Sequence, residues 1–120
     1  PVAPIPFVTR RFRGHFMLID LRTYTLLPGK TREYLALYEE HAKEVQLSHL
    51  GNLVGYFTSE VGPLNEAVHI WAYKDWQDRA DRRASMWADP RFDNAAARLY
   101  PLIQRQENKL LTPTGFSPLR

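Results

Sequence analysis

The sequence of 120 residues predicts a single α+β domain whose strands and helices follow in the order β-α-β-β-α-β. Four segments alternate in polarity or are rich in β-branched and aromatic residues, which is typical of strands. Two longer segments repeat apolar residues at helical spacing, and Gly and Pro punctuate the chain between segments. A chain of this length can bury one hydrophobic core.

The first strand is predicted at residues 17–27, where MLIDLRTYTLL alternates and Pro28-Gly29 ends the pattern. Residues 30–50 follow as the first helix, and Gly51 supplies its C-terminal stop. The apolar positions of this helix recur at helical spacing and are Tyr34, Tyr38, Ala42 and Val45.

Residues 52–61 and 67–74 are the next two strands, and the short loop between them predicts an antiparallel pair. Asp75 caps the second helix, which Asp89-Pro90 breaks and restarts. Residues 102–112 form the last strand. The predicted apolar face of the second helix consists of Trp76, Ala80, Ala84, Trp87, Phe92, Ala95, Ala96 and Leu99.

This order of elements indicates a ferredoxin-like βαββαβ sandwich, because right-handed crossovers place both helices on one face of a four-stranded antiparallel sheet. The first and third strands are the most apolar, so we expect them at the centre of the sheet. The fourth strand contains QRQENK, which is polar on both of its faces and suits an edge.

Residues 1–16 lie outside every periodic element, so we expect an extended N-terminal arm followed by one domain at 17–120. Met17 stands directly before the first strand, and we hypothesise that the natural chain starts there. The arm contains three Arg and no acidic residue, but three Pro and no Ser argue against a mitochondrial transit helix.

Composition excludes several classes of function. The arm accounts for the whole formal net charge of +3, so the neutral body predicts no nucleic-acid partner. No apolar run is long enough to predict a membrane span, and the absence of Cys favours a reducing compartment, so we expect a cytoplasmic protein. His41 and His49 are eight residues apart, which does not suit a metal pair, and we predict neither metal nor cofactor.

The two faces of the predicted sheet differ in chemistry. One set of alternate residues is small and aliphatic, and comprises Ile19, Leu21, Thr23, Leu53, Gly55, Phe57, Val68, Ile70 and Ala72. The other is aromatic and polar, and comprises Asp20, Arg22, Tyr24, Val54, Tyr56, Thr58, Glu60, His69, Trp71 and Tyr73, with Arg105 and Glu107 as candidate neighbours. We expect the aliphatic set under the helices and the aromatic set covered by a second copy of the sheet, which gives a homodimer enclosing a barrel. In the alternative geometry the aromatic set faces the helices and the aliphatic set lines the dimer barrel.

Three blocks resemble the NIPSNAP family of the dimeric α+β barrel superfamily. They are LRTYTLLPGK at 21–30, GNLVGYFTSEVGPLNEAVHIWAYKDWQDRADRR at 51–83, and LLTPTGFSPL at 110–119. The resemblance implies a ferredoxin-like fold and a homodimer. It implies no catalytic residues, although the superfamily includes cofactor-free monooxygenases, haem-degrading enzymes and lactone isomerases, and animal members of the family are linked with mitochondria and with protein interactions there.

Three residues are the catalytic candidates. We expect burial to tune His69 as an acid or base near neutrality, Arg22 to hold an anionic group, and Tyr24 to donate to the same oxygen. The alternatives are a buried His satisfied by hydrogen bonds and an Arg22 that only pairs with a carboxylate. The predicted ligand-binding residues around them are Tyr56, Glu60, Trp71, Tyr73 and Arg105.

The sequence therefore predicts a homodimeric module that binds a small organic ligand in a polar and aromatic cavity, with cofactor-free oxygenation or isomerisation as candidate reactions. The alternative is a non-catalytic interaction or scaffold protein, in which the same residues only hold the dimer together. A ligand-sized cavity converging on His69, Arg22 and Tyr24 favours the first prediction, and a filled interior favours the second.

Overall fold

The computed structural model describes residues 17–120, so the predicted arm at 1–16 lies outside the described residues. The predicted order of strands and helices is confirmed. The elements are β1 (Leu18–Leu26), α1 (Thr31–Leu37), the π-helical segment η1 (Tyr38–Ala42), α2 (Lys43–Leu50), β2 (Leu53–Thr58), β3 (Glu66–Tyr73), α3 (Trp76–Ala88), α4 (Pro90–Leu99), the 3₁₀ segment η2 (Tyr100–Leu102) and β4 (Ile103–Leu111).

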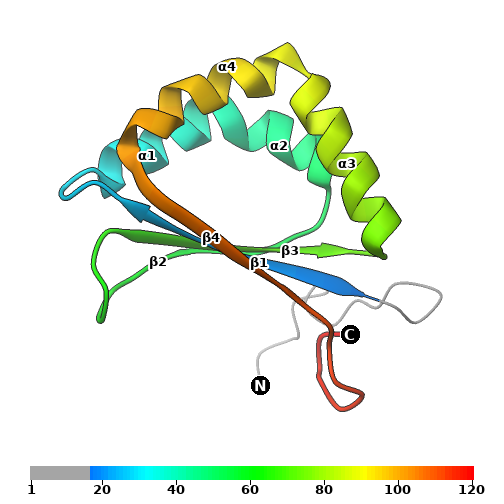
Figure 1. Ribbon diagram of the computed structural model, residues 1–120. Coiled ribbons are helices and arrows are strands. Elements are labelled where there is room, and N and C mark those ends of the chain that lie inside the picture. Colours follow the sequence, from blue (N-terminus) through cyan, green and yellow to red (C-terminus); the bar gives the residue numbers. More distant parts are fainter. Residues whose placement is uncertain (1–16) are drawn as a thin grey trace, which may run out of the picture.

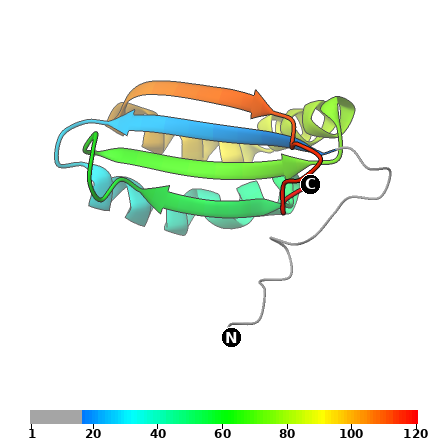
Figure 2. The same ribbon diagram turned by 90° about the horizontal axis from the view of Figure 1, so that it is seen from below.

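The four strands form one antiparallel sheet in the order β2-β3-β1-β4. The helices pack on one face of this sheet, while among the described residues the opposite face carries no helix (Figure 1). Seen from that open face, β1 and β3 are central and β4 is an edge strand (Figure 2). The ferredoxin-like prediction and the strand positions are therefore confirmed.

Helices α3 and α4 begin at the capping residues that the sequence predicts. Asp75 accepts a hydrogen bond from the backbone N–H of Asp78 at 2.8 Å and caps α3, and Asp89 accepts one from the backbone N–H of Arg91 at 2.9 Å and caps α4. Pro90 occupies the first turn of α4, where its missing N–H costs nothing. The predicted break at Asp89-Pro90 is confirmed.

His49 links α2 to the corner between α3 and α4. Its Nδ1 lies 2.8 Å from Ser85 Oγ on α3, and its Nε2 lies 2.8 Å from an Asp89 carboxylate oxygen at the start of α4. Both ring nitrogens of His49 are therefore engaged in fixing α2 against the α3–α4 corner.

The expected assignment of the two sheet faces is wrong, because the aromatic set faces the helices, as in the first part of the alternative geometry. Trp71 and Tyr73 are fully buried under the helices, in a core with Val45 of α2, Met86 of α3 and Phe92 of α4. Aromatic rings provide enough buried area to fill the wide gap between sheet and helices, and this favours the larger set on that face.

The open face carries the aliphatic set instead. Ile19 and Ala72 pack there with Val54 and Ile70, and Leu119 of the C-terminal tail lies against them. Leu53 and Val54 exchange their expected faces because the β2–β3 register shifts between Leu53 and Gly55: the bulge puts Val54 on the open face and Leu53 against the helix-side core.

The predicted neighbours from the fourth strand are wrong by one residue. In the β1–β4 register Arg105 pairs with Thr25 and Glu107 with Thr23, on the open face. Because alternate residues point to opposite faces, the residues of β4 that accompany the aromatic set are Gln106 and Asn108.

The predicted inner face of α3 is also wrong. Trp76 is 59% exposed and Trp87 is 41% exposed, and the fully buried residue of α3 is Met86. Arg79 and Arg83 share the face of Met86, at spacings of four and three residues. Because two of the residues on the inward face are arginines, the spacing of apolar residues alone predicts the wrong face of α3.

Candidate functional site

A cavity of about 170 Å³ lies between the sheet and the helices. Its volume compares with that of a cavity that holds benzene, ~150 Å³. Trp87 and Tyr100 line it and are also solvent-exposed, so they mark the side on which it opens. The lining residues come from every layer and are Arg22, Tyr24, Tyr34, Tyr38, Gln46, Tyr56, His69, Arg83, Met86, Trp87, Phe92, Ala96, Leu99, Tyr100, Ile103 and Gln106.

The three catalytic candidates converge on this cavity. Arg22 of β1 and His69 of β3 are direct cross-strand partners, and Tyr24 lies edge-on to the His69 ring with centroids 4.8 Å apart. Arg22 Nε donates a hydrogen bond to Tyr24 Oη at 3.2 Å. One short stretch of two central strands therefore presents a guanidinium, a phenol and an imidazole to the same space.

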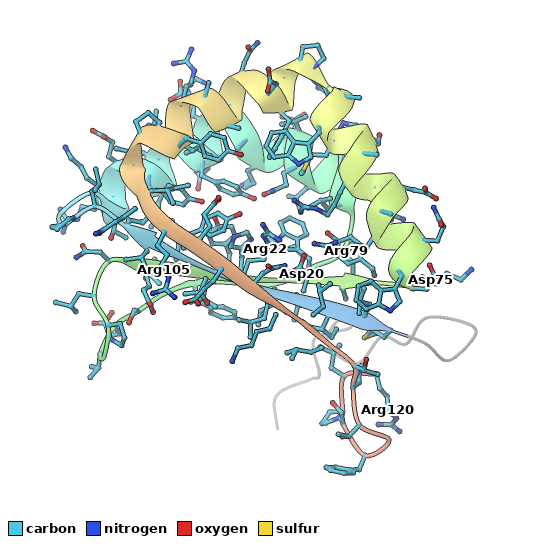
Figure 3. The ribbon with its side chains drawn as sticks, viewed as in Figure 1. Asp20, Arg22, Asp75, Arg79, Arg105 and Arg120 are labelled. Atoms are coloured by element: carbon cyan, nitrogen blue, oxygen red, sulfur yellow. The ribbon has the colours of Figure 1, made fainter. Side chains whose placement is uncertain are left out.

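Asp20 orients the cations beside this group. Its side chain is fully buried, and its Oδ2 accepts hydrogen bonds from Arg22 Nη1 and Arg79 Nε, both at 3.2 Å. Its Oδ1 accepts from Asn108 Nδ2 at 3.0 Å. Figure 3 shows Asp20, Arg22 and Arg79 together between the sheet and α3. This carboxylate ties β1 to β4 and α3 at the edge of the cavity.

His69 does not titrate near neutrality, which corrects the expectation from the sequence. Burial, reinforced by the charge of Arg22, lowers its pKa from 6.5 to about 3, so the ring is neutral at pH 7. Trp71 Nε1–H donates to His69 Nδ1 at 2.7 Å, and an indole N–H can only donate. The proton of the neutral ring is therefore on Nε2, which has no hydrogen-bond partner among the described residues.

Tyrosines from the first helix and from β2 supply further polar groups of the cavity wall. Tyr34 and Tyr56 share a hydrogen bond of 2.8 Å between their hydroxyls, and Tyr38 donates to Gln46 Oε1. Burial raises the pKa of Tyr34, Tyr38 and Tyr56, so all three stay protonated across the physiological range. Tyr56 also stacks on His69, with ring centroids 4.5 Å apart and an interplanar angle of 10°.

Tyr38 begins η1, a π-helical turn inside the otherwise regular first helix. Such turns occur frequently at functional sites, because an extra residue rotates the side chains that follow. The predicted helix over residues 30–50 contains no signal for this turn.

The predicted ligand-binding residues separate into two groups. Tyr56 lines the cavity, and Trp71 and Tyr73 are buried in the adjoining core without lining it. Glu60 is exposed on the loop after β2, and the Arg105 side chain is 69% exposed and bonded to Glu107 on the open face. Glu60 and Arg105 are therefore removed from the candidate site.

Sequence reasoning missed Arg83, Gln46 and Gln106, all of which line the cavity. Arg83 belongs to the mixed-sign run that begins at Asp75, and such a run is ordinarily a solvated helix face. Its spacing from Arg79 and Met86 is the signal that identifies the inward face of α3.

Residues 17–120 contain no group of three or more His, Asp or Glu side chains arranged to hold a metal ion. None of the helices described there is long and apolar enough to cross a membrane.

Comparison with known proteins places this arrangement in a family. The sequence pattern of the NIPSNAP family matches residues 19–118. The chain belongs to the NIPSNAP family. It is 40% identical over 101 residues to a NipSnap protein of Caenorhabditis elegans, covering 83% of this chain and 19% of that protein. It is 34% identical over 104 residues to human NipSnap homolog 2, covering 86% of this chain and 35% of that one. This NIPSNAP chain thus spans a minor part of these relatives.

Solved structures agree with the family and the fold. A NIPSNAP family protein of unknown function from Agrobacterium tumefaciens is 48% identical, with a TM-score of 0.86 over 90% of this chain and 97% of that one. A second solved structure is from Nitrosomonas europaea and bears the name antibiotic biosynthesis monooxygenase. It has a TM-score of 0.62 over 90% of this chain and 99% of its own, at 13% identity. At this identity the second similarity shows a shared fold alone and assigns no role to any residue of the NIPSNAP chain.

Proposed function

We propose that this NIPSNAP family member binds a small organic molecule in the cavity between its helices and its sheet. The observation that carries the proposal is the cavity itself, about 170 Å³ in volume, onto which Arg22, Tyr24 and His69 converge. A protein whose interior only holds a scaffold together gains nothing from such a space, because an unfilled cavity costs packing energy. The ligand-binding prediction is therefore preferred over the scaffold prediction.

The polar groups of the cavity suit a ligand that carries or develops negative charge on oxygen. Guanidinium, phenol and imidazole N–H groups all donate hydrogen bonds, and preorganised donors stabilise an oxyanion in a water-poor site. Oxygenation and isomerisation without a cofactor remain the candidate reactions, since both pass charge onto a substrate oxygen. His69 would act in them as a hydrogen-bond donor, because its neutral ring carries the proton on Nε2.

Filling the cavity should abolish ligand binding and leave the fold intact. A panel of ring compounds of benzene size, charged and neutral, is screened by thermal shift, where a ligand at 100 times its Kd stabilises by about 2.7 kcal/mol. Ala96 is buried on α4 and lines the cavity. In Ala96→Leu the added side chain occupies the free volume, so we expect every hit to lose its shift.

Ala97→Leu is the matched control, because Ala97 is exposed on the same helix. It should retain the shifts of the wild-type protein. Hits that survive Ala96→Leu, or a panel without any hit, would contradict binding in this cavity.

The open face of the sheet is the surface on which we propose that two copies pair. Ile70 lies there among aliphatic neighbours, and Phe57 is 53% exposed. Exposed apolar side chains on a sheet face favour a cover, and a second copy of the same face gives a closed two-fold assembly. The resemblance to dimeric α+β barrels supports the same pairing.

Light scattering at micromolar concentration should therefore give twice the chain mass of 14.0 kDa. Ile70→Glu should give a monomer or an aggregate, because it places an unpaired charge against the partner sheet. Val61→Glu is the control, since Val61 is 90% exposed on the β2–β3 loop, and it should remain dimeric. A wild-type monomer at this concentration would refute the pairing.

A further inference from the structure

We infer that the ligand of the cavity is a planar organic anion whose charge lies on oxygen, such as an aromatic carboxylate or an enolate, and that Arg83 is the group that binds this oxygen. The inference rests on the proposed function and names the class of ligand. It depends on Arg83, on the balance of buried charges and on the shape of the cavity walls.

Arg83 lacks a counterion in the free protein. It lines the cavity from α3 and forms no ion pair with any described residue. Burial and the nearby charge of Arg22 both lower its pKa, so the folded protein holds this charge at a cost. The carboxylate whose charge acts on Arg83 is that of Asp20, which already pairs with Arg22 and Arg79.

Among the described residues, this group therefore contains three half-buried guanidinium ions and one fully buried carboxylate. A surplus of positive charge is costly even where it is only partly removed from water, because desolvation penalises an ion that has no counterion. A bound oxyanion would supply the missing negative charge. A guanidinium is well suited to this task, because its fork of N–H donors matches the two oxygens of a carboxylate.

The remaining donors and walls define the rest of the ligand. His69 Nε2–H is a buried donor that has no partner among residues 17–120, on a ring that lines the same cavity. Tyr56 is stacked on this ring, and Met86, Phe92 and Leu99 provide apolar contact. Aromatic and aliphatic walls around a volume close to that of benzene favour a flat apolar body over a sugar or a polyamine.

Benzoate and benzamide test the inference, because they share size and shape and differ in charge. Isothermal titration should show that benzoate binds the full chain at least about tenfold more tightly than benzamide. Arg83→Met keeps most of the side-chain stem and removes the charge. It should lower benzoate affinity about tenfold or more, leave benzamide affinity within about twofold, and raise the melting temperature of the free protein.

Arg82→Met is the matched control, because Arg82 is the neighbouring arginine and bonds to Asp78 on the exposed side of α3. It should retain the benzoate affinity. Benzamide binding as tightly as benzoate would overturn the anion class while the proposed function stands. Benzoate binding that survives Arg83→Met would overturn the role of Arg83. Failure of both probes and of every compound of the thermal-shift panel would overturn the proposed function as well.

Discussion

Asp20→Asn should destabilise the protein by about 3–5 kcal/mol, which is the usual cost of removing one partner of a buried ion pair. Asp20 is fully buried and is the hydrogen-bond acceptor for Arg22, Arg79 and Asn108. With an amide in its place, the guanidinium groups of Arg22 and Arg79 lose the buried carboxylate that they share. Urea unfolding at fixed protein concentration measures the change, which is a large fraction of a typical total stability of about 5–15 kcal/mol.

Asp81→Asn is the matched control, since Asp81 lies on the exposed face of α3 and accepts a hydrogen bond from Gln77. The same substitution there should change stability by no more than about 0.5 kcal/mol. Adding Arg83→Met to Asp20→Asn should recover part of the lost stability, because one of the uncompensated cations is removed. Equal effects at Asp20 and Asp81 would contradict the charge balance described for the cavity.

The second large effect is a loss of stability in mild acid that depends on His69. Its pKa is near 6.5 in the unfolded chain and is lowered by burial to about 3 in the folded protein. Between these values the unfolded state takes up a proton that the folded state does not, so stability falls as the pH falls. The slope approaches about 1.4 kcal/mol per pH unit well below pH 6.5, and the loss between pH 6.5 and pH 5 is about 1.6 kcal/mol.

His69→Asn removes this titration while placing an amide oxygen near the position of Nδ1, where Trp71 donates. Stability measured against pH should therefore be flatter for the variant than for the wild-type protein below pH 6.5. Parallel profiles would show that His69 is not held neutral. The ¹⁵N chemical shifts of the ring give an independent measure, because at pH 7 they should report a proton on Nε2 alone.

The sequence by itself determined the order of elements, the central position of β1 and β3, and the break at Asp89-Pro90. These features follow from local chemistry. Pro and Gly end segments, Asp caps helices, and alternation distinguishes strands from helices wherever it occurs. It also identified Arg22, Tyr24 and His69 as members of one group, because residues of matching parity on neighbouring strands lie on the same face whichever face that is.

Only the tertiary structure decided which face of the sheet the helices cover. Both sets of alternate residues contain enough apolar area to be buried, so periodicity cannot rank them. The inward face of α3 could not be predicted for a related reason, since Arg79 is stabilised inside by Asp20 from a strand about 60 residues away, and Arg83 faces the cavity. Strand register decided the remaining positions. The bulge in β2 keeps Val54 away from the cavity, and the pairing of β4 with β1 brings Gln106 to it instead of Arg105. Long-range pairing thus determined the site, and local sequence determined the scaffold that carries it.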